Sequence, residues 1–548
     1  MTEMHDYIVV GGGPGGCPVA NRLSVDGRTT VCLLEAGGDN KHATVRVPLL
    51  LIANVPKKNG FNWAFDTVPQ KGLNGRIGYQ PRGKGMGGSS AINALVYMRG
   101  HPGDYDEWEA MGCPGWGYRD VLPLFRKSEH NEVFRDAFHG QGGELNVAAL
   151  RTDNRYHKLL TDMLRQAGLR ETDPNGAEQE GYSVAQVMQK NGERCSSANA
   201  FIEPIQATRK NLTVHLNTQA TRIVFEGKRA VGVEVVQQGQ ARTIRARKEV
   251  ILAAGALQTP QLLQLSGVGR AADLKPLGIP IVHDLPEVGY QLSDHPDFIL
   301  GYQIPDADGL LGLSPKGLFG LWGQWGRYKR EQRGMFTSNF AEINGFMRLT
   351  PRSPRPEVQY EFVVGLAIDH ARKLEPRHGL SCHILCLRPK SRGSVKLQSA
   401  RWQDAPLIDP NFLDHPDDVR EMVEGAKRVD RIVKGSREIG PRIKKDLFTA
   451  DCRSDADWEA VIRARADTNY HPVGTCRMGT DDRAVVDARS LKVNGLQGLR
   501  VSDASVMPAI TGGNTTAPTV LISEKCAEFV LAEARASASP VHAAAMVS

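Results

Sequence analysis

The chain begins with a short apolar run that leads directly into closely spaced glycines. Residues 7–10, Tyr-Ile-Val-Val, have the composition of a buried parallel strand. The glycines that follow have the spacing G-x-G-x-x-G and are Gly11, Gly13 and Gly16. Such glycines allow a tight turn, a close approach of backbone to a pyrophosphate, and close packing of the next helix on the strand.

A second apolar run, residues 30–34, ends at Glu35, whose carboxylate can accept hydrogen bonds from a ribose diol. Strand, glycines, helix and acid therefore occur in the order of a dinucleotide-binding site. An ordinary glycine-rich turn would leave Glu35 without a role. The sequence predicts a dinucleotide site at this end of the chain.

A second glycine-rich element spans residues 84–94 and follows Pro81-Arg82-Gly83. Its small residues would let backbone approach a flat ligand, and Ser89, Ser90 and Asn93 can form hydrogen bonds in a tight space. A glycine-rich turn followed by a helix that Ser90 caps would also fit the pattern. The residues alone leave both interpretations open.

The size and composition are those of an ordinary soluble protein with two joined domains. The 548 residues are 41% hydrophobic and 24% charged, and the net charge of +7 is spread along the chain. Scattered lysines and arginines do not indicate nucleic-acid binding. Residues 1–5 are too short for a signal peptide, and no apolar run reaches the roughly 18 residues of a membrane span, so we expect neither.

The nine cysteines are dispersed and contain no C-x-x-C pair, which favours reduced thiols in the cytoplasm. The densest group is Cys382, His383 and Cys386. These residues lie in an apolar, strand-like run, where cysteines are common core residues. A metal site there is the weaker interpretation, and we predict no metal.

Further motifs occur in an order that resembles the glucose–methanol–choline (GMC) oxidoreductases, from Asp6 to about Ala532. They comprise residues 11–16 with Glu35, 81–93, 115–123, 249–263, 470–479 and 513–518. The chain looks most like the bacterial FAD-dependent alcohol dehydrogenases of this family, which include choline, aliphatic-alcohol, polyethylene-glycol and sorbose dehydrogenases.

The resemblance implies an α/β fold in which a Rossmann-like FAD-binding domain is interleaved with a substrate domain built on an antiparallel sheet. We expect the FAD-binding domain in residues 1–40, 193–302 and 462–548, and segments that cover the cofactor in 41–192. The substrate-binding domain is expected in 303–461, and a flexible tail in 533–548.

The resemblance also implies that the dinucleotide is FAD. In some members a histidine in the second glycine element is covalently attached to the flavin, but the matching residue here is Ile92, so we predict non-covalent FAD. Ala220 matches a contact to adenine, and Asp503 and Ala504 match contacts to the ribityl-phosphate arm. The cofactor-binding residues that we predict are Gly11, Gly13, Pro14, Gly15, Gly16, Glu35, Gly87, Gly88, Ser89, Asn93, Ala94, Ala220, Ala254, Gly255, Asp503, Ala504, Asn514, Thr515 and Thr516.

His471 is the predicted catalytic base. Pro472 restricts the backbone before it, and an imidazole titrates near neutral pH, which suits removal of a hydroxyl proton. In the family the catalytic pair is His–His or His–Asn; here the resemblance assigns His471 and Asn514, with Asn514 holding the alcohol oxygen.

The implied reaction is oxidation of an alcohol to an aldehyde or ketone, with hydride transfer to flavin N5. We expect a dehydrogenase that passes electrons to a quinone or another acceptor. An oxidase that reduces O₂ to H₂O₂ is the first alternative, and a carbon–carbon lyase of the hydroxynitrile type is the second. A non-catalytic FAD-binding module is the remaining one.

The middle of the chain, expected to supply the pocket walls, leaves the alcohol open among aliphatic, aromatic, polyol and polyether classes. Residues 310–333 combine tryptophans with basic residues. They would wall the substrate entrance or pack in the core; the alternative is contact with a membrane surface, which would place a cytoplasmic protein peripherally on the inner membrane.

Local patterns predict further elements. We expect helices in 106–127, 255–265 and 417–434, and strands in 211–216, 223–226, 230–236 and 248–254. Two more strands, in 382–388 and 393–397, are expected to belong to one sheet that roofs the active site.

Overall fold

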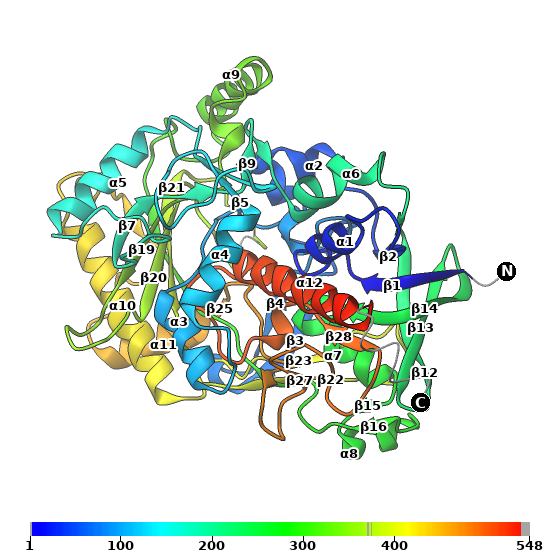
Figure 1. Ribbon diagram of the computed structural model, residues 1–548. Helices are drawn as coiled ribbons and strands as arrows, with labels where there is room; N and C mark the ends of the chain where they lie inside the picture. The colour runs from blue at the N-terminus through cyan, green and yellow to red at the C-terminus, as the bar shows by residue number, and fades with distance from the viewer. Residues whose placement is uncertain (1–2, 370–371, 374, 539–548) are drawn as a thin grey trace, which may run out of the picture.

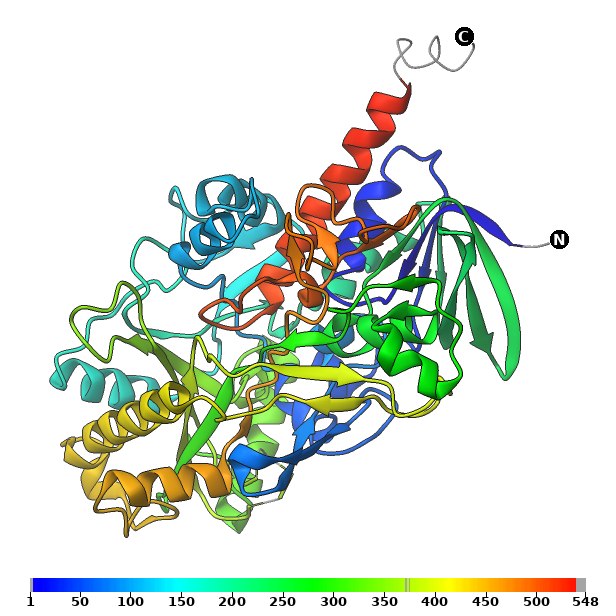
Figure 2. The ribbon, with the colours of Figure 1, turned by 90° about the horizontal axis from the view of Figure 1, so that it is seen from below.

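The computed structural model describes residues 3–369, 372–373 and 375–538 (Figure 1). Two large sheets organise these residues. The first carries the N-terminal strand and the second forms most of the opposite end. Figure 2 shows the antiparallel ribbon of residues 218–237 far from the helices of residues 416–435 and 455–465, which cover the second sheet.

The first sheet has a parallel core with the strand order β11-β2-β1-β14, and β28 pairs with β14. These strands are β1 (Met4–Val10), β2 (Val31–Leu34), β11 (Leu212–His215), β14 (Gln240–Leu252) and β28 (Leu499–Val501). The first residues of β14 pair instead with β13 (Arg229–Gln237), which pairs with β12 (Thr218–Glu226) in an antiparallel ribbon. All residues of β2 are buried, as expected of a parallel strand covered on both faces.

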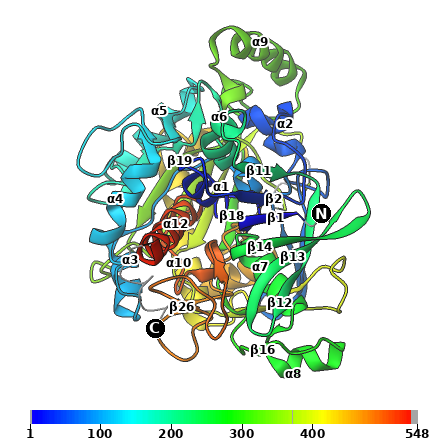
Figure 3. The ribbon, with the colours of Figure 1, turned by 45° about the vertical axis from the view of Figure 1, so that its right-hand side comes forward.

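Three helices pack on this sheet and bring distant segments together. They are α1 (Cys17–Leu23), α7 (Gly255–Leu265) and α12 (Thr516–Ala538). Figure 3 shows α12 running beside α1, where Ser523 Oγ accepts a hydrogen bond from Val19 N at 3.1 Å and Arg22 pairs with Glu524 at 2.6 Å. The C-terminal helix therefore closes the sheet that the N-terminal strand begins.

The second sheet is antiparallel, in the order β24-β18-β21-β20-β19-β7, with β25 paired to β18. Its strands are β7 (Gly181–Val184), β18 (Pro296–Gln303), β19 (Ala341–Met347), β20 (Val358–Val363), β21 (Gly379–Cys386), β24 (Lys445–Asp446) and β25 (Asp467–Thr468). The helices α5 (Arg155–Gln166), α10 (Pro416–Gly435) and α11 (Asp455–Arg465) lie on its outer side.

The two faces of this sheet differ in polarity, although both are buried. On β20, Val358, Tyr360 and Phe362 pack in the hydrophobic core with α10. The residues between them include Gln359 and Glu361, which point to the other face, because side chains alternate along a strand. A buried face with polar side chains is unusual for a structural core and indicates a site.

The structure refines several sequence predictions. The strands and helices expected in 211–216, 223–236, 255–265 and 417–434 are confirmed as β11, β12–β13, α7 and α10. The helical region expected in 106–127 consists of two helices, α3 (Pro102–Ala110) and α4 (Tyr118–Ser128), and Gly112 and Gly115 between them have φ of +91° and +78°.

Two other predictions were wrong in part. Strand β22 (Gly393–Lys396) does not join β21 in one sheet; it lies in a separate sheet with the order β17-β22-β23-β3-β4. The other strands of that sheet are β3 (Phe65–Gln70), β4 (Arg76–Gln80), β17 (Tyr290–Leu292) and β23 (Leu407–Asp409). Residues 533–538 are not a tail, because α12 continues to Ala538, and Glu533 forms ion pairs with Arg500 at 2.6 Å and Lys492 at 2.7 Å. Residues 539–548 lie outside the described part of the chain.

The expected domain division stays a prediction. The strands of the first sheet fall in the segments expected for the FAD-binding domain. In the second sheet, β7, β25 and all of β18 except Gln303 lie outside 303–461. Helix α9 (Pro315–Glu331) projects from the top of the molecule in Figure 1. No helix among the described residues is long and apolar enough to cross a membrane.

We expect Gly15→Ala to destabilise the protein without bound FAD, and Gly13→Ala to leave that stability unchanged. A β-carbon at Gly15 would lie 2.1 Å from the carbonyl oxygen of Ser502, so two backbone segments would have to separate, at a cost on the order of 1–3 kcal/mol. At Gly13 the nearest atom would be Gly88 Cα at 3.6 Å, an ordinary contact. Thermal unfolding of both variants measures the difference, and equal melting temperatures would contradict the proposed tight contact.

Candidate active site

A cavity of about 1050 Å³ is lined by residues of both large sheets. One wall is the glycine turn after β1, the acid after β2 and the turn between β14 and α7. Another is the polar face of the second sheet, represented by Glu361 and His383. The C-terminal segments that contain His471 and Asn514 complete it. The cavity is thus built from the beginning, middle and end of the chain.

Most of the predicted site residues line this cavity. They are Gly11, Gly13, Pro14, Gly15, Glu35, Gly88, Ser89, Asn93, Ala94, Ala220, Ala254, Gly255, His471, Asp503, Ala504, Asn514, Thr515 and Thr516. Gly16 and Gly87 are not among the lining residues. A β-carbon at Gly16 would lie 2.0 Å from the carbonyl oxygen of Gly11, and one at Gly87 would lie 2.9 Å from Ser196 Oγ, so both glycines permit packing behind the cavity wall.

Glu35 connects three turns of the cavity wall. Its carboxylate accepts hydrogen bonds from the backbone amides of Gly12, Gly37 and Gly85, at 2.9, 2.8 and 2.9 Å. A carboxylate has about four lone-pair sites, so these bonds leave capacity for one further donor on the cavity side. The side chain anchors the backbone and can still meet a ribose hydroxyl.

Asp503 orients the start of α7. Its carboxylate accepts hydrogen bonds from Gly255 N at 2.9 Å, Thr259 Oγ1 at 2.6 Å and Ser505 N at 2.9 Å. Burial raises the pKa of Asp503, whereas these hydrogen bonds favour its charged form. The amide end of α7, with its positive dipole, is thereby fixed at the cavity wall.

The backbone around His471 is held in an unusual conformation. Tyr470 has φ of +70°, a region that non-glycine residues seldom adopt, and its carbonyl oxygen accepts a hydrogen bond from Arg82 Nη2 at 2.9 Å. The amide of His471 donates to Asp294 Oδ1 at 2.8 Å. Together with the restriction that Pro472 imposes, these contacts direct the imidazole into the cavity.

A chain of hydrogen bonds assigns the protons on two histidines. His295 Nε2 is 3.0 Å from Leu387 O, which can only accept, so His295 Nε2 carries a proton. In a neutral His295, Nδ1 is then the acceptor, and its neighbour at 3.0 Å, His471 Nδ1, is the donor. His471 Nε2 is then unprotonated, and its lone pair accepts a hydrogen bond from Asn514 Nδ2 at 3.2 Å.

Both histidines are neutral at neutral pH. Burial lowers the pKa of His471 well below its usual value, and the nearby His295 and Arg82 lower it further. Burial also lowers the pKa of His295 to about 4. His471 Nε2 is therefore an unprotonated base with a fixed orientation. The Asn514 amide lies beside it, so both groups can contact one oxygen atom of a ligand.

Sequence analysis did not identify the polar groups on the second sheet or His295. His383 Nδ1 is 2.5 Å from Asp297 Oδ2, and although burial opposes the charged form, Asp297 raises the pKa of His383. Glu361 accepts a hydrogen bond from Gln359 Nε2 at 2.8 Å. The available signal was the alternation of polar and apolar residues in 358–363 and 380–386.

The cysteine group does not form a metal site. Cys382 and Cys386 pack in the hydrophobic core, whereas His383 lines the cavity on the opposite face of β21. Residues four apart on a strand are also separated by roughly 13 Å.

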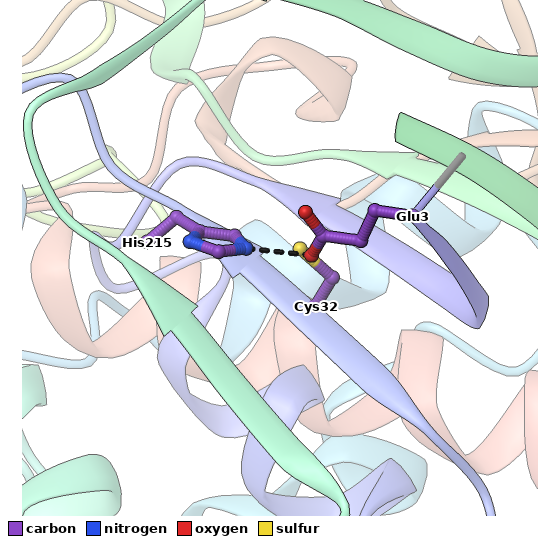
Figure 4. A group of neighbouring side chains, drawn as sticks. All are labelled: Glu3, Cys32 and His215. Atoms are coloured by element: carbon purple, nitrogen blue, oxygen red, sulfur yellow. Dashed lines mark hydrogen bonds and ion pairs between the residues drawn. The ribbon is translucent and has the colours of Figure 1, made fainter. Parts of the chain in front are cut away.

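Glu3, Cys32 and His215 lie close together at the edge of the first sheet (Figure 4). The carboxylate of Glu3 accepts from His215 Nε2 at 2.6 Å and pairs with Arg242 and His5. Although burial acts in the opposite direction, hydrogen bonds from His215, Arg242 and His5 lower the pKa of Glu3 to about 2. Because Arg242, His215 and His5 already bind this carboxylate, the group is a polar cluster centred on the Glu3–Arg242 ion pair rather than a metal site.

Comparisons with protein families and curated proteins agree with this geometry. Family models described as GMC oxidoreductase match residues 5–297 and 389–523. The chain is 44% identical over 538 residues to an alcohol dehydrogenase [acceptor] of Pseudomonas putida, covering 96% of both chains. It is 38% identical over 543 residues to the mitochondrial choline dehydrogenase of Homo sapiens, covering 96% of this chain and 90% of that protein.

Solved structures share the whole fold. A pyridoxine 4-oxidase from Mesorbium loti has a TM-score of 0.84 at 28% identity, over 96% of this chain and 98% of that one. A variant of formate oxidase from Aspergillus oryzae RIB40 has a TM-score of 0.88 at 26% identity, over 97% of this chain and 98% of that one.

We expect Glu361→Gln to change how stability depends on pH. Burial raises the pKa of Glu361 to about 7, while His383 acts in the opposite direction. The folded state thus binds this proton more tightly than the unfolded state. Protonated Glu361 therefore stabilises the folded state, and this contribution is fully present below the unfolded pKa. The contribution, roughly 1–3 kcal/mol, is lost as the pH rises through about 7.

The measurement is denaturant unfolding of the holoprotein between about pH 4.5 and pH 8, which spans the unfolded and folded pKa values of Glu361. Wild type should lose stability across this range relative to Glu361→Gln. The solvent-exposed Glu234→Gln is the matched control and should follow wild type. Parallel curves for wild type and Glu361→Gln would contradict the raised pKa.

Proposed function

Because the chain belongs to the GMC oxidoreductase family and is therefore an FAD-dependent oxidoreductase, we propose that it oxidises an alcohol to an aldehyde or ketone and passes the electrons to a quinone or another acceptor. The observation that carries the proposal is the pair of His471 Nε2 and Asn514 Nδ2, 3.2 Å apart, in a cavity that the glycine turn after β1 also lines.

The residues fit FAD. The glycine turn after β1 leaves the cavity wall without side chains at Gly11, Gly13 and Gly15, as a pyrophosphate requires. Glu35 is available to the ribose. Ala220 lines the same cavity two residues after Thr218, whose amide donates to Glu35 O at 2.8 Å. Ile92 lines the cavity with a hydrocarbon side chain that cannot form a bond to the flavin, which supports non-covalent binding. When bound, FAD supplies the hydride acceptor.

The chain's own residues would manage the proton and the oxygen. His471 Nε2, unprotonated and aimed by His295, accepts the hydroxyl proton of the alcohol. The Asn514 amide donates to the alcohol oxygen as negative charge develops on it. Both contacts strengthen in the transition state, so they contribute to catalysis rather than to binding alone.

His295 would act as a positioning residue. Its Nδ1 accepts a hydrogen bond from His471 Nδ1–H, and this bond keeps the lone pair of His471 on Nε2. The same hydrogen bond becomes stronger when His471 is protonated, because the donor then carries positive charge.

The free thiols support a reducing compartment. All nine cysteines are unpaired, which fits the expected cytoplasmic location.

An oxidase is the second candidate, favoured by the likeness to the pyridoxine 4-oxidase and formate oxidase structures. We favour a dehydrogenase, because the Pseudomonas putida relative, which is 44% identical, is named alcohol dehydrogenase [acceptor]. A carbon–carbon lyase would release an aldehyde without net flavin reduction, and a module that only binds FAD would not be reduced by any alcohol.

We expect the alcohol-reduced enzyme to react faster with a quinone analogue than with O₂. The measurement is an anaerobic screen of alcohols that follows loss of the flavin absorbance, after which the reduced enzyme is mixed with air-saturated buffer or with the quinone. Stoichiometric H₂O₂ and reoxidation by O₂ at the faster rate would instead establish the oxidase.

We expect His471→Ala to slow flavin reduction by alcohol about 10²–10⁴-fold while FAD stays bound, because the proton acceptor is lost. Rapid mixing with the best alcohol of the screen measures the rate. His283→Ala, which replaces a histidine outside the cavity lining, is the control and should behave as wild type.

The same assay tests the role of His295. His295→Leu removes the acceptor for His471 Nδ1–H and should slow reduction roughly 10–100-fold, as loss of an orienting partner does in other sites. His295→Gln can still accept at its amide oxygen and should recover part of the rate. Wild-type rates of flavin reduction in both His295→Leu and His471→Ala would refute His471 as the base.

A further inference from the structure

Helix α9 carries a row of apolar side chains on the face that points away from the protein. Phe319 and Trp322 are 83% and 80% exposed, and Leu318 is 51% exposed. Leu318 and Trp322 are four residues apart and Phe319 lies beside them, so the three share one side of the helix. In Figure 1 the helix stands clear of the rest of the chain.

The opposite side of α9 belongs to the protein. Gly317 and Tyr328 are buried, and Leu321 lines the large cavity. Ser314 caps the helix by accepting from Gly317 N at 3.1 Å, and the Ser314 hydroxyl is 2.7 Å from His378 Nε2. The inner side of the helix is therefore held against the protein, and this packing keeps its outer aromatic residues exposed to solvent.

This helix lies at the mouth of the cavity. The cavity is lined by Leu311–Leu313 before α9 and by residues 49–57, which include the 3₁₀ helix η1 (Pro48–Ala53). Both segments also expose apolar side chains, with Ile52 43% and Leu313 42% exposed. Exposed hydrocarbon is thus present both on the outer face of α9 and on the two segments that line the cavity.

Positive charge surrounds this apolar surface. Lys57 and Lys58 follow η1, and Lys316, Lys329 and Arg330 are exposed on α9. The only carboxylate of the helix, Glu331, is already paired with Arg327 at 3.1 Å. Aromatic and aliphatic residues flanked by lysine and arginine are the composition of helices that lie in the headgroup region of anionic membranes.

We propose that α9 and η1 dock the mouth of the cavity on the surface of an anionic lipid bilayer. Phe319, Trp322 and Leu318 enter the headgroup–acyl boundary, and the surrounding cations contact lipid phosphates. The cavity then opens toward the membrane, where apolar alcohols and lipid-soluble electron acceptors concentrate. Docking is independent of the proposed reaction, whereas this delivery route rests on it.

The first test is flotation of the holoprotein with vesicles that contain phosphatidylglycerol, compared with vesicles of phosphatidylcholine alone. Wild type should float with the anionic vesicles. Phe319→Ser/Trp322→Ser should bind them roughly tenfold or more weakly, since two large apolar contacts are lost. The control Val25→Ser/Ile77→Ser replaces residues that are 62% and 52% exposed outside α9 and should float like wild type.

A charge variant separates the two contributions. Lys329→Glu/Arg330→Glu should lose the preference for anionic vesicles while keeping the apolar face. All variants should reduce their flavin with a water-soluble alcohol at the wild-type rate, which shows that they are folded and that docking, not catalysis, has changed.

Two results would overturn the proposal. One is a wild-type protein that stays with neither kind of vesicle, or that floats no better than Phe319→Ser/Trp322→Ser. The other is light scattering that shows a dimer in wild type and a monomer in that variant, because the apolar face would then bind a second copy of the chain.

Discussion

Direct contact between backbone segments from distant parts of the chain is the constraint on which the cavity depends. A β-carbon at Gly37 would lie 2.4 Å from Gly85 N, and one at Gly11 would lie 2.3 Å from Ala253 O. No side chain fits between these segments, so they can meet only where the sequence has glycine. Glu35 then joins three of the turns through their amides. A flat ligand can lie against a wall of this kind because the wall consists largely of backbone.

The opposite wall is chemically different, and its arrangement decides where a proton can go. The antiparallel sheet uses one face for a conventional core and the other for polar groups. Just after the end of β21, one carbonyl oxygen, that of Leu387, fixes the tautomer of His295, and His295 in turn fixes that of His471. Basicity at one ring nitrogen thus depends on a peptide group that does not itself touch the reacting atoms.

Sequence patterns were sufficient for the parts of the molecule that depend on local chemistry. The strand, glycine turn and acid at the N-terminus, the helix from Gly255 to Leu265 and the periodic helix α10 follow from spacing, and all are present. His471 and Asn514 were found through motifs, and the structure brings them together. The pairing of β22 with β17 and β23 was missed, because strand partners depend on contacts far apart in the sequence. His295 was missed for a similar reason: its role comes from His471, 176 residues away.

The order of the strands in the first sheet has a consequence for biosynthesis. The sheet begins with β1 at the N-terminus, but β28 and the covering helix α12 come near the other end of the chain. A nascent chain emerging from the ribosome would expose the edge of β14 and the apolar side of α1 until these last segments are translated. Contacts of such long sequence separation form slowly, and partly folded chains with open edges tend to aggregate. Assembly of the ligand cavity is therefore a post-translational event that would benefit from chaperones.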